Sequence, residues 1–115
     1  MLENLEPKSV FSFFEEIDQI PRGSGNTQKI SDYLAEFAKK RNLFYIQDTL
    51  GNVIIKKDGT AGMEEKEPVI IQGHMDMVAV KDADCTIDMT KDGLQLEILG
   101  GRLSAKGTSL GGDDG

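Results

Sequence analysis

The stretch VIIQGHMDMV, residues 69–78, sets the expected fold. Its apolar run from Val69 to Ile71 lacks polar alternation, which predicts a central strand covered on both faces. His74 and Asp76 follow this run, at the carboxyl end where open α/β sheets usually place their ligands. Because the two residues are two positions apart on an extended backbone, we expect their side chains on the same side.

The pair His74 and Asp76 has the chemistry of half a metal site. A neutral imidazole is a preferred zinc ligand, and a nearby carboxylate can orient the ring and fix its tautomer. A hydrogen-bonded structural histidine at a strand end is the simpler alternative. The motif alone therefore leaves both interpretations open.

A second motif, GTSLGGDDG, occupies residues 107–115. Its glycines allow the backbone to approach a small ligand or cation, and Asp113 and Asp114 supply oxygen ligands that can bridge divalent ions. Adjacent side chains point in different directions, so we expect at most one to bridge. The alternative is a glycine-rich turn with two solvated aspartates. A phosphate-binding loop fits worse, because the Gly-Lys-Ser/Thr ending is missing.

Two helices are expected before these motifs. Pro7 suits the first turn of the first helix, and Pro21 ends it. Residues 22–26, RGSGN, form an expected flexible connector, and Asn26 or Thr27 can cap the second helix. Each helix has an apolar stripe that we expect to face the core: Val10, Phe13, Phe14, Ile17 and Ile20 in the first, and Ile30, Tyr33, Leu34, Phe37 and Ala38 in the second.

Several strands are expected after Arg41. Two runs, 43–47 and 52–56, flank a turn at 48–51 and predict a hairpin, while the polar residues 57–67 predict an exposed loop. Further strands are expected at residues 86–89, 94–99 and 102–105. The predicted fold class is α/β, with two helices packed on a mixed sheet whose central strand ends at His74.

Composition excludes several classes of partner. With 20 acidic and 13 basic residues, the net charge of -7 disfavours nucleic acid and anionic membranes. The acidic amino-terminal stretch does not match a signal peptide, and no apolar run is long enough to span a membrane. Cys85 is the only cysteine, which fits a reducing compartment. We therefore expect a cytoplasmic protein.

Taken together, GHMDMV and GTSLGGDDG resemble the zinc aminoacylase, carboxypeptidase and dipeptidase family. The segments IPRGSGNTQKISDYLAEFAKK and LGNVIIKK are most similar to its bacterial aminoacyl-histidine dipeptidase branch. The resemblance implies that His74 ligates one of two zinc ions, that Asp76 positions this imidazole, and that Asp113 bridges the ions. It implies a small peptide, such as an Xaa-His dipeptide, as substrate, and leaves a homodimeric parent protein open.

The family pattern also needs a general-base glutamate and further aspartate and histidine ligands, which we expect beyond Gly115. Residues 1–115 are accordingly expected to be the amino-terminal portion of a catalytic domain, inactive alone and with exposed apolar surface. The alternative is a noncatalytic remnant or interaction module that binds a cation weakly.

Overall fold

The computed structural model describes residues 1–112, which form two helices and four strands. Two compact units are present. The first comprises Met1–Ile30 and the chain from Met75 onward, and the second comprises Ser31–His74. The expected α/β class is confirmed.

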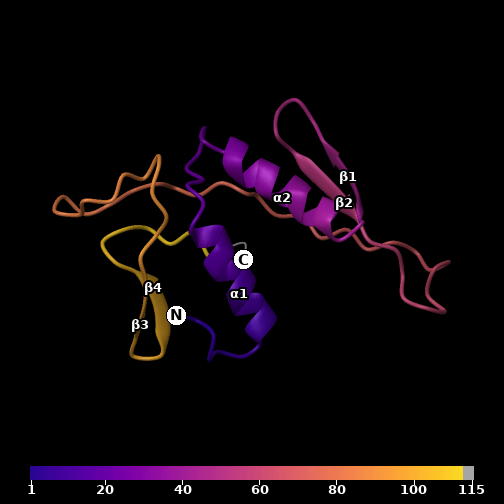
Figure 1. The fold of residues 1–115 in the computed structure, drawn as a ribbon, viewed down its shortest axis with the longest axis horizontal. Helices are drawn as coiled ribbons and strands as arrows, with labels where there is room; N and C mark the ends of the chain where they lie inside the picture. The colour runs from indigo at the N-terminus through magenta and orange to yellow at the C-terminus, as the bar shows by residue number, and fades with distance from the viewer. Residues whose placement is uncertain (113–115) are drawn as a thin grey trace. The chain divides into compact units, whose positions relative to one another are not determined.

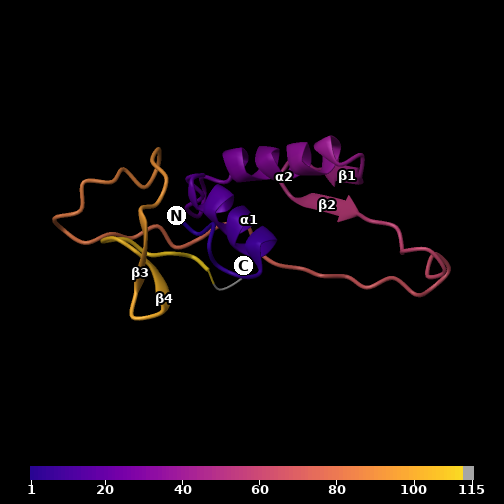
Figure 2. The same ribbon diagram turned by 60° about the horizontal axis from the view of Figure 1, so that its bottom comes forward.

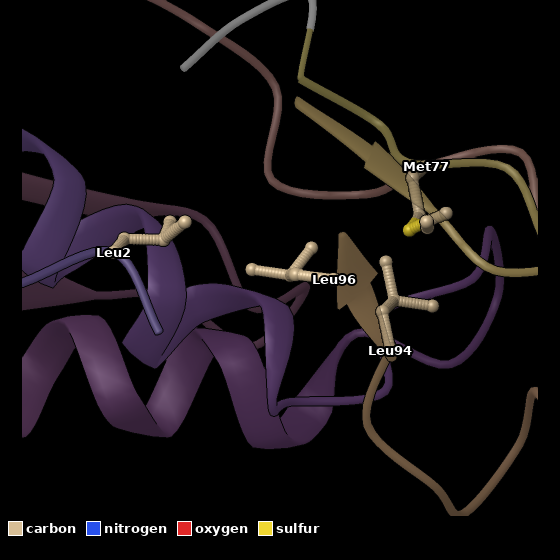
Figure 3. Close-up of a cluster of buried hydrophobic side chains, with 5 residues drawn as sticks. Leu2, Met77, Leu94 and Leu96 are labelled. Atoms are coloured by element: carbon tan, nitrogen blue, oxygen red, sulfur yellow. The ribbon is translucent and has the colours of Figure 1, made fainter. Parts of the chain in front are cut away.

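The first unit contains helix α1 (Lys8–Asp18) and the antiparallel hairpin of β3 (Leu96–Leu99) and β4 (Arg102–Ala105). Pro7 precedes α1, and its carbonyl accepts the Val10 and Phe11 amides at 3.1 and 3.3 Å. The core of this unit gathers side chains from distant parts of the sequence, with Leu94 and Met77 facing one another (Figure 3). Its buried members are Leu2, Met77, Leu94, Leu96 and Ala105.

The second unit holds most of helix α2 (Gln28–Lys40) and the antiparallel hairpin of β1 (Phe44–Gln47) and β2 (Val53–Lys56). Helix and hairpin are joined through the buried Ser31. Its hydroxyl donates to the Gly51 carbonyl at 2.6 Å and accepts the Gln47 side-chain amide at 2.8 Å. Asp48 closes the turn by accepting the Leu50 and Asn52 amides at 2.9 Å.

The expected single mixed sheet is replaced, within residues 1–112, by two separate antiparallel strand pairs, one in each unit (Figure 1). The predicted hairpin at 43–56 is confirmed, and the strands predicted at 94–99 and 102–105 form a second antiparallel pair, because local turns can pair strands that are close in sequence. A mixed sheet needs pairing between distant segments, and the described residues form none between these hairpins.

The predicted central strand at residues 69–71 is not a strand among the described residues. Val69, Ile70 and Ile71 are 86%, 88% and 96% exposed, and the chain between β2 and β3 contains no helix or strand (Figure 2). Periodicity indicates only which residues could be buried. A strand also requires a neighbouring strand to accept its backbone hydrogen bonds. The predicted strand at 86–89 is absent for the same reason.

The helical stripes are confirmed in part. Ile30 and Ala38 are buried in α2, and Phe14 of α1 packs against the first unit's core. The prediction for Val10 is wrong, because its side chain is 52% exposed. Phe11, which the predicted stripe did not include, packs against the first unit's core instead. Residues 57–67 are exposed and contain no helix or strand, as expected. Among residues 1–112, no helix is long and apolar enough to cross a membrane.

Candidate metal centre

The backbone after Pro21 lies alongside the GHMDMV segment. The Met77 amide donates to the Arg22 carbonyl at 2.9 Å, and the Ser24 amide donates to the Met77 carbonyl at 3.1 Å. Gly23 and Met77 thus form a parallel bridge. A Cβ on Gly23 would come within 2.9 Å of the Ala79 Cβ, so glycine permits this close approach.

This arrangement corrects the prediction of a flexible connector at residues 22–26. Arg22 and Gly23 are buried, and the Asn26 amide donates to the Gly23 carbonyl at 2.8 Å. The Asn26 side chain also donates to the Thr90 carbonyl at 3.1 Å. Glycine and serine suggested flexibility, but the long-range backbone bonds to Met77 hold the segment in place.

Asp76 is partly buried and is held by a residue that sequence reasoning missed. The Ser24 hydroxyl donates to Asp76 Oδ2 at 2.6 Å. A carboxylate that accepts a short hydrogen bond has a restricted orientation. A carboxylate restricted in this way is suited to orienting an imidazole. The available signal in the sequence was Ser24 itself, a serine that follows Arg22 and Gly23 after the end of the first helix.

The Gly-rich loop before Asp113 packs on the same segment. Gly111 has a φ of +65°, and a Cβ there would lie 2.6 Å from the Met77 Cβ. Ser109 adds a second attachment, because its hydroxyl donates to the Val78 carbonyl at 2.6 Å and its amide to the Val80 carbonyl at 3.0 Å. The structure therefore brings the two sequence motifs side by side at Met77.

A buried ion pair lies at the same junction. Arg22 Nη2 donates to Asp18 Oδ1 at 3.0 Å and to the Gly111 carbonyl at 3.0 Å. Burial is the largest influence on Asp18 and raises the pKa of its carboxyl to about 6, with the Arg22 guanidinium opposing the shift. Neither residue stood out in the sequence, because Gly111, 89 positions after Arg22, meets the pair only in the folded chain.

The predicted metal ligands are placed only in part. His74 is exposed and is the last residue of the second unit, whereas Asp76 belongs to the first unit. Asp113 and Asp114 lie outside the described residues. Among residues 1–112, no three His, Cys, Asp or Glu side chains form a group that could hold a metal ion.

The available donors nevertheless fit a divalent metal by their chemistry. An exposed imidazole, a carboxylate held by a hydroxyl, and a loop leading to two carboxylates offer the nitrogen and oxygen ligands that zinc accepts. The ligand roles expected from the sequence for His74, Asp76 and Asp113 stay predictions.

Comparison with known proteins shows that this chain is similar to two dipeptidases over nearly its whole length. One relative is the cytosol non-specific dipeptidase of Escherichia coli (strain K12), 39% identical over 114 residues, which are 99% of this chain and 24% of the relative. The crystal structure of aminoacylhistidine dipeptidase from Vibrio alginolyticus matches with a TM-score of 0.94 and 38% identity.

That structural match covers 99% of this chain and 23% of the Vibrio protein, so the chain spans about a quarter of the length of each relative. No family model matches the chain. The resemblance to the dipeptidase family that the two motifs indicated is confirmed by these relatives.

Proposed function

We propose that the protein carrying this segment is a cytoplasmic two-zinc dipeptidase that hydrolyses small peptides, Xaa-His dipeptides among them. Both relatives are named as dipeptidases, and the Vibrio protein is named for aminoacyl-histidine substrates. The name of the Escherichia coli relative supports a cytosolic location, as does the single cysteine of this chain.

The observation that carries the proposal is the contact between Gly111 and Met77. It brings the loop that leads to Asp113 against the segment that contains Asp76. The two motifs are 29 positions apart, counted from Gly107 back to Val78, so only folding makes them neighbours. Neighbouring carboxylates and an imidazole are what a two-metal site requires.

Each residue has a separate role in this proposal. His74 would contribute an imidazole ligand, the Asp113 carboxylate would be shared by the two metal ions, and Asp76 would orient the His74 imidazole. The Ser24 hydroxyl restrains Asp76 through the 2.6 Å hydrogen bond. When bound, divalent ions polarise the scissile carbonyl and lower the pKa of water, so hydrolysis needs no protein nucleophile.

The decisive experiment is an assay of the full-length gene product. A panel of dipeptides that includes β-alanyl-histidine is incubated with the purified protein before chelation, after chelation and after zinc is restored. We expect cleavage that chelation abolishes and zinc restores. A folded, zinc-loaded protein that cleaves none of them would favour the noncatalytic alternative.

A further inference from the structure

We propose that Arg22 is a positioning residue that fixes the loop leading to Asp113, an inference that rests on the proposed function. Arg22 is only 6% exposed. It lies beyond the end of α1 and directly follows Pro21 in the sequence. Its Nη2 atom donates to the Gly111 carbonyl at 3.0 Å and lies 3.5 Å from the Leu110 carbonyl. Its own carbonyl accepts the Met77 amide at 2.9 Å.

Arg22 therefore contacts both motifs at once. Its backbone holds the segment that contains Asp76, and its side chain holds the chain two residues before Asp113. Gly111 has no side chain to anchor it and has a φ of +65°. A glycine-rich loop loses much conformational freedom on ordering, so an external donor to its carbonyls restricts it effectively.

The buried ion pair of Asp18 and Arg22 does not have the geometry expected of a pair that serves stability alone. Asp18 is 1% exposed, and within the described residues its Oδ2 and Arg22 Nε are buried without hydrogen-bond partners. Buried ion pairs with unmet polar atoms are often no more stabilising than apolar replacements. An ion pair that also directs a cation at the Gly111 carbonyl suits positioning.

The alternative is that Arg22 only balances Asp18. The double variant Asp18→Asn/Arg22→Met separates the two roles, because it removes both buried charges and leaves neither unpaired. In the full-length protein, we expect it to keep a cooperative melt, to bind zinc about 10–100-fold more weakly, and to keep the wild-type KM for dipeptide at saturating zinc.

The matched control is Arg41→Met. Arg41 lies in the second unit, with its guanidinium 3.4 Å from the centre of the Phe37 ring, so the variant repeats the arginine-to-methionine substitution outside the first unit. We expect it to bind zinc with wild-type affinity. Zinc affinity is measured by competition with a chelator of known affinity, and folding by circular dichroism.

A folded double variant with wild-type zinc affinity would overturn the positioning role. If the double variant does not fold, Arg22→Lys replaces it. This change keeps a cation beside Asp18 but removes the planar guanidinium and its fixed N–H donors. Weaker zinc binding by Arg22→Lys supports the proposal, and unchanged binding rejects it. Wild-type protein that neither binds zinc nor cleaves dipeptides would instead reject the proposed function, and the positioning role with it.

Discussion

Gly111 lies directly against Met77, so close that a Cβ on the glycine would stand 2.6 Å from the Met77 Cβ. Met77 in turn packs with Leu94 and Leu96 in the buried cluster of the first unit (Figure 3). The loop that precedes Asp113 is thus seated on a core side chain. The position of this loop depends on glycine for both space and backbone conformation.

Gly111→Ala should therefore disturb the loop strongly. The positive φ costs about 1–2 kcal/mol for a residue with a Cβ, and overpacking against Met77 adds about 1–3 kcal/mol. Gly100→Ala is the control, because Gly100 also has a positive φ, of +55°, but no atom within 4 Å of an added Cβ. Thermal melts of both variants check this, and equal losses would contradict the contact.

Ser24→Ala should weaken zinc binding with little effect on folding. Ser24 is exposed, so loss of its hydroxyl leaves no buried group unsatisfied, but Asp76 loses a 2.6 Å hydrogen bond. Loss of an outer hydrogen bond of this kind lowers metal affinity about 10-fold or more. Chelator competition measures the effect. Ser12→Ala, on an exposed part of α1, is the control, and equal affinity of the two variants would count against the role of Ser24.

Ser31→Ala should loosen the second unit. The hydroxyl is fully buried and links α2 to the hairpin through Gly51 and Gln47. Its removal leaves the Gly51 carbonyl without that donor, at a cost of about 1–3 kcal/mol. Hydrogen exchange of the 44–56 hairpin should become faster while the β3–β4 hairpin is unchanged. Unchanged exchange at both hairpins would show that Ser31 does not join helix and hairpin.

Asp18 should make the folded state less stable as the pH rises, which is opposite to the usual effect of a carboxyl group. Its pKa is raised from 3.8 to about 6, mainly by burial, so the folded state holds the proton more tightly than the unfolded chain. Its favourable contribution is full below pH 4 and is lost as the pH rises to about 6. Asp48 and Asp88 have lowered pKa values from hydrogen bonds to Asn52 and Thr90 and oppose this trend.

The difference in melting temperature between wild type and Asp18→Asn isolates this effect from the other carboxyls. We expect the advantage of the wild type to shrink between pH 4 and pH 6 and then to stay constant. A difference that is constant across this whole range would show that the pKa of Asp18 is not raised.

Local patterns predicted the elements with local partners. Both helices, the first hairpin and the two strands of the second were found because amphipathic stripes and turn residues act over a few positions. The run at Val69 was misjudged because burial depends on what covers a segment, which the run itself does not encode. Arg22 was missed in the same way, since its partners Asp18 and Gly111 meet around its guanidinium only in the folded first unit.

The two sequence motifs are neighbours in the structure, because the loop at Gly111 meets the segment at Met77. The ligand roles of His74, Asp76 and Asp113 stay predictions. Only the conjunction of both motifs indicated the dipeptidase family, since each motif alone has an ordinary structural interpretation.

The most direct test of the central claim is the zinc anomalous signal in crystals of the full-length, zinc-loaded protein. We predict two neighbouring peaks with the Asp113 carboxylate between them, the His74 imidazole on one, and Asp76 behind that imidazole. The same crystals of Asp113→Ala should lose at least one peak. Zinc bound away from both motifs, or two peaks that persist in Asp113→Ala, would contradict the account.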